Sequence, residues 1–503
     1  MSQIKFSCSD SAVLVSALAA GILIGYAHLY LFPSELNPNL ITQPYLIDRG
    51  FILYRDLGDQ KPPLLILLVT WLMPFFQGDP VTAARTLHFS IVVLLVFLAI
   101  TWVYRRAGLW AAVFSGLFML AWSQFLGLWA TAYYDLVTSL FFIFFFLLMT
   151  WSDPGKQTIK AIVGGLLVGI AMLVKQQAIL LVLIYLAWIV IELITHRLPP
   201  RKSASLLAAF SGGLLIPIMV FLISSQYRSN TLNESIFWNF TLLLQNSFST
   251  LGALGIPPAQ LFRVLQILIL LIPFTAFLFF PDLGSGFPRS TRLWLLVFLS
   301  AAALFQYPRF SSRHWAVVFP FAAIISGIAC ADIILLIKRR GVYLVLSIFL
   351  IAPAWWAYRA ASQYTASLSH PQNVIGEYTD LFPLAEELER KIPLTGSIAI
   401  FPTDEANANL HYILQRDPPR YFIYHYPWFM NNAIIKEKWI TALESEKTPV
   451  LLNFPRTWEV NIYAPELINY INENYQIIDT VEWKGHSIQI MLRNPDKYTL
   501  IIQ

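Results

Sequence analysis

The sequence predicts an α-helical, multi-pass membrane protein that carries a soluble α/β domain at its C-terminal end. Three observations lead to this fold class. Hydrophobic residues make up 57% of the 503 residues and charged residues only 13%, whereas soluble proteins carry about 25% charged residues. The apolar runs are long enough for helices and lack the two-residue alternation of a membrane barrel. After Tyr358 the composition changes to that of a soluble domain.

Twelve apolar segments in the membrane half are suited to helices. The first continues to Phe32, well beyond the roughly 7 to 15 residues of a signal-peptide core, so we expect an uncleaved span with Lys5 on the cytoplasmic side. The segments are about 11–32, 62–76, 82–104, 109–128, 131–151, 160–176, 178–195, 204–225, 261–281, 292–306, 315–337 and 341–358.

The basic residues orient these segments, because Lys and Arg in short connections mark the cytoplasmic side. With that assignment the segments from residue 82 onward cross the membrane in alternating directions. The first span ends on the outer side and the segment that begins at 82 also starts there, so segment 62–76 between them cannot cross. It has only 15 residues and opens with Pro62 and Pro63, which suits a short interfacial helix. We therefore expect about eleven full spans, a cytoplasmic N-terminus and an outer C-terminal region. The basic connections are Arg105 and Arg106, Lys156 and Lys160, His196 to Lys202, Arg289 and Arg292, and Lys338 to Arg340.

Two domains are expected, a membrane domain over 1–360 and an extracytoplasmic α/β domain over 361–503. The first outer loop covers 33–80, and 226–260 mix polar and apolar residues as an interfacial amphipathic loop does. In the outer domain, short β-like runs alternate with helical stretches. The runs are 397–401, 420–424, 449–453, 476–483 and 486–492, and the helical stretches are 404–415, 433–445 and 465–473.

Several function classes lack support in the sequence. The net charge of +5 is spread over short loops instead of one patch, which argues against nucleic acid as a partner. The two cysteines, Cys8 and Cys330, are too few for a disulfide framework, and the eight histidines show no metal spacing. There is no P-loop, no GxGxxG, no HExxH and no GxSxG motif.

The first outer loop holds the densest group of charged residues in the membrane half. A carboxylate in such a loop can act as a general base and still reach a lipid substrate. The alternative is that these charges only solvate the connection between two membrane segments. The candidates are Glu35, Asp48, Arg55, Asp56, Asp59 and Lys61.

Further candidates lie on the same outer side in this topology. Asp135 opens a very apolar span, where an unpaired acid costs on the order of several kcal/mol, so it is either functional or a helix N-cap. Lys175 precedes two glutamines between apolar helices and either functions or snorkels to the headgroups. Arg309 and Arg313, beside His314, either bind headgroups or join the other cations in neutralising a phosphate-linked lipid substrate.

One string in the first loop is specific enough to indicate a family. Gly50 to Pro63 reads GFILYRDLGDQKPP, and along the chain follow Arg85, the YYD of 133–135, the helix GLLVGIAMLVKQQA and the helix RHWAVVFPFAAI. In this order the pieces resemble the GT-C fold membrane glycosyltransferases of the protein mannosyltransferase type (family 39), whose bacterial members include the lipid A aminoarabinose transferases. The resemblance covers roughly residues 10 to 360 and implies the GT-C fold.

The resemblance also implies a reaction. Such enzymes transfer a sugar from a polyprenyl-phosphate-linked donor to a lipid, glycan or protein acceptor, with inversion, at the outer face of a bacterial inner membrane. Their base is an acid at the start of the first outer loop. The family commonly has an Asp-Glu pair there, whereas this chain has Ser34 and Glu35, so Glu35 and Asp48 both stay candidates. The implied phosphate-binding residues are Arg55, Lys61, Lys175, Arg309 and Arg313, and those implied for the acceptor or a divalent metal are Asp56, Asp59 and Asp135.

Two other functions fit parts of the sequence. A transporter or flippase for a lipid-linked substrate would need charges in mid-span and paired halves with broken helices. Here the charges lie mostly at span ends and no internal repeat is visible. A non-catalytic membrane scaffold would use the region from residue 360 to the end of the chain to bind a partner.

Overall fold

The structure of the chain is a computed structural model that describes residues 8–26, 35–125, 131–132, 134–151, 153–242, 289–305, 312–336, 381–392, 396–404, 407–455 and 460–494. The chain divides into two compact units. Unit 1 comprises Met1–Ser34, Arg85–Phe221 and Thr250–Val374, and unit 2 comprises Glu35–Ala84, Leu222–Ser249 and Ile375–Gln503.

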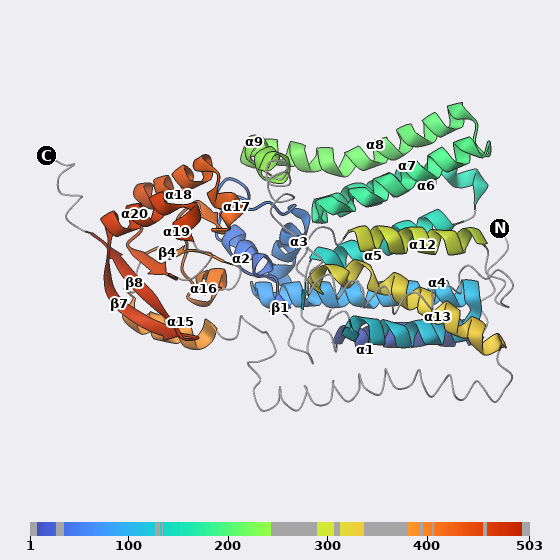
Figure 1. The fold of residues 1–503 in the computed structure, drawn as a ribbon, viewed down its shortest axis with the longest axis horizontal. Coiled ribbons are helices and arrows are strands. Elements are labelled where there is room, and N and C mark those ends of the chain that lie inside the picture. The colour runs from blue at the N-terminus through green and yellow to red at the C-terminus, as the bar shows by residue number, and fades with distance from the viewer. Residues whose placement is uncertain are drawn as a thin grey trace. The chain divides into compact units, whose positions relative to one another are not determined.

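Unit 1 is built from apolar helices that run roughly parallel to one another (Figure 1). In the part of the chain that the structure describes, five helices are long and apolar enough to cross a membrane, and four apolar helices are shorter. The predicted helical membrane protein is thus confirmed, while segments 261–281 and 341–358 lie outside the described residues. The helices are α1 (Cys8–Tyr26), α4 (Pro80–Phe125), α5 (Tyr134–Thr150), α6 (Gln157–Val174), α7 (Leu180–Ile194), α8 (Pro200–Ser224), α12 (Arg289–Leu304) and α13 (Phe319–Leu336). Short pieces are β3 (Thr131–Ala132) and the 3₁₀ turns η5 (Pro154–Lys156), η6 (Gln176–Ile179) and η9 (Ser312–Val317).

Helix α4 contains two helices that meet at Gly108. The φ of 86° and ψ of −177° at this residue interrupt the helical backbone, and glycine adopts such a conformation without the steric cost that a Cβ imposes. The interruption follows Arg105 and Arg106, where the sequence predicts the connection between segments 82–104 and 109–128. That connection is confirmed.

Small residues bring α6 and α8 into backbone contact. A Cβ at Gly165 would lie 2.0 Å from the carbonyl oxygen of Phe210, and one at Gly213 would lie 2.2 Å from that of Ile162. Only glycine allows this approach, which is a common way for membrane helices to associate. The backbones of α6 and α8 therefore touch directly at these glycines.

Phenylalanines hold α5 against α12 and α13. The ring of Phe146 meets Phe298 edge-on at 5.3 Å and Phe321 at 5.6 Å between centroids, and all three side chains are buried. Edge-to-face pairs of this kind add to the free energy gained from burial alone. This cluster fixes the helix whose first turn carries Asp135.

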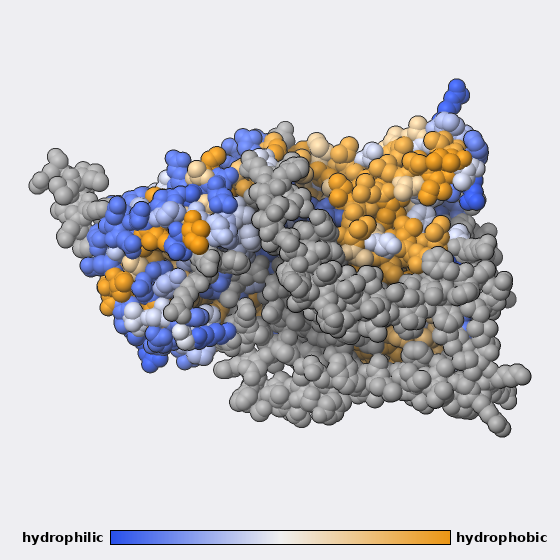
Figure 2. Space-filling view, in the orientation of Figure 1, coloured by the Kyte–Doolittle hydropathy of each residue, from blue (hydrophilic) through white to orange (hydrophobic). Residues whose placement is uncertain are grey.

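The outward faces of α7 and α8 are apolar. Figure 2 shows an extended hydrophobic surface over these helices, bordered by hydrophilic residues at the turn that joins them. A bilayer is the solvent that such a surface requires. Its exposed residues include Leu183, Leu186, Val190, Leu215, Ile216, Met219 and Val220.

Unit 2 begins with the first loop. Its α3 has nine residues and continues into a four-residue 3₁₀ turn. The combined apolar helix Leu64–Phe76 is about 20 Å long at 1.5 Å per residue, shorter than the ~30 Å hydrocarbon core. This length agrees with the prediction that segment 62–76 does not cross. The elements are β1 (Glu35–Leu36), η2 (Pro38–Leu40), α2 (Thr42–Asp48), β2 (Leu57–Gly58), α3 (Leu64–Leu72) and η3 (Met73–Phe76), joined later by the π-helical turns η7 (Ser225–Ser229) and η8 (Phe237–Thr241) around α9 (Leu232–Ile236).

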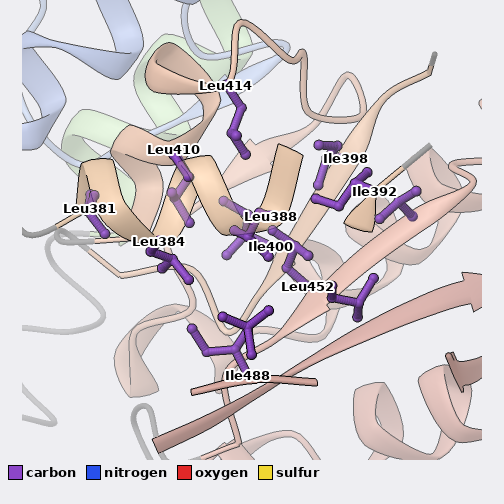
Figure 3. Close-up of a cluster of buried hydrophobic side chains, with 14 of the residues drawn as sticks. Leu381, Leu384, Leu388, Ile392, Ile398, Ile400, Leu410, Leu414, Leu452 and Ile488 are labelled. Carbon is purple, nitrogen blue, oxygen red and sulfur yellow. The ribbon is translucent and has the colours of Figure 1, made fainter. Parts of the chain in front are cut away.

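The C-terminal part of unit 2 is the predicted α/β domain. Its four-stranded sheet has the order β4-β6-β8-β7, with β4 and β6 parallel and the other pairs antiparallel. Helix α15 repeats buried leucines at helical spacing and packs them on this sheet (Figure 3). The strands are β4 (Ile398–Phe401), β5 (Phe422–Ile423), β6 (Val450–Asn453), β7 (Tyr475–Trp483) and β8 (His486–Arg493), and the helices are α15 (Leu381–Lys391), α16 (Leu410–Ile413) after η11 (Asn407–Asn409), α17 (Pro427–Met430), α18 (Ala433–Ser445), α19 (Val460–Tyr463) and α20 (Pro465–Asn474).

The first loop and the C-terminal domain are joined by a small second sheet. Strand β5 lies outside the four-stranded sheet and pairs in parallel with β2, Leu57 opposite Phe422 and Gly58 opposite Ile423. Gly58 leaves room for the buried Trp238, because a Cβ there would lie 2.3 Å from the indole ring. The loop therefore folds together with residues more than 360 positions away.

Candidate functional site

The predicted site residues lie in both units, and the first group surrounds Asp56 in unit 2. The buried carboxylate of Asp56 accepts two hydrogen bonds from the Arg55 guanidinium, at 2.8 and 3.0 Å, and one from the Ile52 backbone N–H at 2.9 Å. A nitrogen of Arg420 lies 3.7 Å away. The hydrogen bond to Asp56 raises the pKa of Arg55. Arg55 and Asp56 thus form an ion pair that shapes the loop.

Asp59 is the second buried acid of the loop. Its Oδ2 accepts hydrogen bonds from the side-chain amides of Asn39 and, at 2.9 Å, Gln43, and its Oδ1 accepts one from the Lys61 backbone N–H at 3.1 Å. Hydrogen bonds to an ionised carboxylate are stronger than those between neutral groups. Asp59 therefore fastens η2 and α2 to the GDQKPP string.

The backbone of Lys61 is held on both sides. Besides the contact with Asp59, its carbonyl oxygen accepts a hydrogen bond from the Tyr54 hydroxyl at 2.9 Å. Burial raises the pKa of Tyr54, so the phenol stays protonated and keeps donating. Tyr54 itself has a φ of 70°, which is uncommon for an aromatic residue and follows from the tight fold of this loop. The loop therefore presents the half-buried Lys61 from a fixed position.

The two candidate bases differ in their surroundings. Asp48 is the last residue of α2 and is exposed, and no described residue donates a hydrogen bond to its carboxylate. Glu35 lies in β1, at the start of the loop, and its side chain is outside the described residues.

Unit 1 contributes an ion pair between Asp135 and Lys175. The Lys175 ammonium donates to Oδ1 of Asp135, whose side chain is completely buried, and it also lies 4.9 Å from the centre of the Phe305 ring. Lys175 caps the C-terminal end of α6, where the chain turns to an extended conformation, and Asp135 is in the first turn of α5. The pairing accounts for both residues without a snorkelling lysine or an N-cap acid.

The two remaining predicted cations follow α12 in the chain. Arg309 lies outside the described residues, as does the side chain of Arg313, whose backbone is in η9. Within the described ranges, no three His, Cys, Asp or Glu side chains are gathered as ligands for a metal ion. The described side chains therefore do not form a site for the divalent metal that the resemblance allows.

Sequence reasoning missed the amides and aromatic residues that support these charges. Asn39 and Gln43 stand in the stretch LNPNLITQPYLI, where polar residues among apolar ones are a signal that the sequence offers. The structure shows that both side chains are buried. Arg420, Trp238 and Phe305 carried no local signal, because their partners are distant in sequence.

The comparisons with known proteins rest on structure alone. No protein-family model and no curated protein sequence matches the chain. ArnT from Cupriavidus metallidurans in the apo state superposes with a TM-score of 0.60 at 14% identity, covering 96% of this chain and 98% of ArnT. The chain has the fold of the GT-C membrane glycosyltransferases.

Other GT-C structures agree. ArnT bound to undecaprenyl phosphate gives a TM-score of 0.59 at 13% identity over 96% of this chain and 98% of that one. The oligosaccharyltransferase of Archaeoglobus fulgidus, in complex with Zn and sulfate, gives 0.51 at 12% identity, over 94% of this chain and 72% of that one. The GT-C resemblance is therefore confirmed at the level of the fold.

Proposed function

We propose that this chain is an inverting glycosyltransferase that moves a sugar from a polyprenyl-phosphate-linked donor to a lipid, glycan or protein acceptor. The observation that carries the proposal is the likeness to ArnT over nearly the whole length of both chains, including an ArnT structure bound to undecaprenyl phosphate. The proposed setting is the outer face of a bacterial inner membrane, with about eleven spans, a cytoplasmic N-terminus and the α/β domain outside.

The proposed reaction is a single displacement. The loop carboxylate removes the proton of the acceptor hydroxyl, the oxygen attacks the anomeric carbon, and the bond to the carrier phosphate breaks with inversion. Cations stabilise the negative charge that develops on the departing polyprenyl phosphate. The mechanism therefore requires residues that bind the phosphate and a residue that acts as the base.

The contacts of the described residues support different proposed roles for the cations. Arg55 and Lys175 each balance a buried acid, so binding a phosphate would require them to share or exchange that partner. The backbone of Lys61 is held from both sides by hydrogen bonds, so the flexible side chain starts from one fixed place in the loop. We assign the carrier phosphate to Lys61, together with Arg309 and Arg313, and assign supporting roles to Arg55 and Lys175.

We assign the base to Glu35 in preference to Asp48. A general base works best when a neighbouring group orients it, and no described residue hydrogen-bonds to the exposed Asp48 carboxylate. Asp56 and Asp59 are fully engaged in loop contacts, which supports a structural role for both.

The test measures sugar transfer by Glu35→Gln and Asp48→Asn, each in full-length protein with a labelled polyprenyl-phosphate sugar. We expect Glu35→Gln to lose at least about 100-fold in rate, the range of a missing general base, and Asp48→Asn to stay within about threefold of wild type. The matched control is Asp153→Asn, an acid in the connection between α5 and α6. Full activity of both loop variants would refute the mechanism.

A second measurement separates the proposal from a transporter. Vesicles that contain the wild-type chain are assayed for carrier-lipid movement and for sugar transfer. Movement without transfer would favour a flippase, and transfer that depends on Glu35 would support the enzyme.

A further inference from the structure

A pocket of about 320 Å³ lies in unit 1 where α5 ends, α6 begins and α7 makes its last turns. Its apolar wall comes from Phe145, Leu148 and Met149 of α5. Its aromatic wall comes from Trp151, Tyr185 and Trp188. Aromatic rings between an apolar wall and charged groups are typical of the membrane–water interface. Such a lining is the kind that a pocket at the depth of lipid headgroups requires.

The pocket offers one cation, Lys160, and several acceptors. One of its two carboxylates, that of Asp153, is paired with the Lys156 ammonium at 3.4 Å, which leaves Glu192 as the carboxylate for a ligand. The Lys160 ammonium donates to the Trp151 carbonyl oxygen and stands 5.4 Å from the centre of the Trp151 ring. These contacts hold the side chain in place. An ammonium has three N–H donors, so further donors remain for an anionic group in the pocket.

Two side chains of the pocket can accept hydrogen bonds from a ligand, Gln157 and Glu192. The side-chain oxygen Oε1 of Gln157 is buried and accepts no hydrogen bond from any residue that the structure describes. The Glu192 carboxylate lies 3.8 Å from a nitrogen of the exposed Arg197, which is too long for a hydrogen bond. A buried acceptor without a donor is costly, so a ligand that brings N–H donors would be stabilised here.

We propose that this pocket binds the headgroup of a phospholipid that carries both a phosphate and a primary ammonium, an ethanolamine-type lipid. Lys160 pairs with the phosphate, while Glu192 and Oε1 of Gln157 accept hydrogen bonds from the ammonium. A choline headgroup has no N–H to donate, and a glycerol headgroup has no positive charge for Glu192. The charges of the pocket thus select among lipids that share the same acyl chains.

The location indicates which leaflet supplies the lipid. The same ends of the helices carry Lys156 and the basic turn that contains Arg197, and such turns mark the cytoplasmic side. The proposed site therefore takes a lipid from the cytoplasmic leaflet. It contains none of the candidate catalytic residues, so it stands independently of the proposed glycosyl transfer.

The test uses the full-length chain, delipidated in detergent and mixed with equal amounts of phosphatidylethanolamine, phosphatidylcholine and phosphatidylglycerol of identical acyl chains. Bound lipid is identified by native mass spectrometry. We expect the first lipid retained to be phosphatidylethanolamine, preferred about tenfold, the factor that one net charge-assisted hydrogen bond provides. Glu192→Gln should abolish the preference over phosphatidylglycerol, and Lys160→Gln should lower the retention of all three lipids. The control Arg201→Gln, at an exposed arginine that does not line the pocket, should behave as wild type.

Equal retention of the three lipids by the wild type would overturn the proposal, because it would show only non-specific annular binding. A preference that survives in Glu192→Gln would also overturn it, since the selecting site would then lie elsewhere. Glu192→Gln conserves side-chain volume, so it decides the question even if Lys160→Gln does not fold.

Discussion

At the residue scale, two buried acids of the candidate site, Asp56 and Asp135, are each paired with a cation within the fold. Asp135 is completely buried, and its carboxylate is matched by the Lys175 ammonium, which is 12% exposed. Removing one partner of a buried pair leaves a desolvated charge, whereas removing both can be nearly neutral. The pair therefore has a structural role that is separable from any role in binding a phosphate.

A double-mutant cycle tests this separation. We expect Lys175→Met to lower the free energy of unfolding by about 3–5 kcal/mol, because the Asp135 carboxylate cannot reach water. Asp135→Asn should cost less, since Lys175 is partly exposed, and the double variant should recover most of the loss. Thermal unfolding in detergent provides the measurement, with the exposed Arg197→Gln as control. Strictly additive losses would contradict the pairing.

Two buried histidines make the C-terminal domain sensitive to acid. Burial lowers the pKa of His411 to about 4 and that of His425 to about 3. Both are therefore neutral in the fold and take up protons in the unfolded chain near pH 6.5. Because the folded pKa values are lowered, the stabilisation is complete above pH 6.5 and is lost as pH falls towards 4 and 3.

The expected loss at pH 5 is about 2 kcal/mol from each histidine. Hydrogen exchange of peptides from residues 396–454, corrected for intrinsic rates and compared between pH 7.5 and pH 5, measures it in the full-length chain. His425→Gln and His411→Asn should each flatten the pH dependence, while the exposed His486→Gln should not. Identical pH profiles in all four proteins would show that burial of these rings has no such effect.

At the element scale, contact between α6 and α8 depends on the absence of side chains. Gly213 faces the backbone of Ile162, whereas a Cβ added at its neighbour Gly212 would meet no atom within 4 Å. The two glycines therefore form a matched pair on one helix. Only a small part of the surface of α8 is buried inside the structure, which is expected for a helix that faces lipid.

We expect Gly213→Ala to destabilise the chain by about 1–3 kcal/mol through overpacking. Gly212→Ala should be neutral or stabilising by up to ~1 kcal/mol, because alanine is the better helix former. Thermal unfolding of both variants in the same detergent makes the comparison. If the two variants lose stability equally, helix contact at Gly213 is not the cause.

At the scale of the whole molecule, unit 2 joins three distant segments of the chain. Trp238 lies against Gly58 of the first loop and meets the Phe429 ring edge-on at 5.2 Å. Arg49 adds a bidentate ion pair to Asp417, at 2.5 and 3.2 Å, although this pair is 41% and 35% exposed and contributes at most about 1 kcal/mol. The buried indole is thus the stronger link between the loop and the α/β domain.

Replacing Trp238 with Ala should remove about 3–5 kcal/mol of local stability. Hydrogen exchange of residues 51–61 should rise, while that of 134–221 should not change, since those residues belong to unit 1. Phe240→Ala, an exposed aromatic residue of the same segment, is the control. Sugar transfer should fall together with the protection of the loop. Uniform loss of protection in both units would show that the effect is global.

Local patterns in the sequence determined the elements. Hydropathy over about 20 residues predicts a span, so the helices, the connection near Gly108 and the shortness of α3 could all be predicted. The alternation of β-like and helical runs likewise predicted the α/β domain. The GFILYRDLGDQKPP string indicated the fold through its resemblance to the GT-C membrane glycosyltransferases.

Only the tertiary structure decided which charges meet. Asp135 and Lys175 are 40 residues apart, and Arg49 and Asp417 are 368 apart. No local pattern encodes such pairs, because each residue by itself is equally compatible with solvent. The pairing of β2 with β5 is of the same kind, since a two-residue strand has no periodicity from which a partner could be read. The sequence alone therefore determined where the charged groups lie along the chain, while burial in three dimensions decided which of them must be neutralised by a partner.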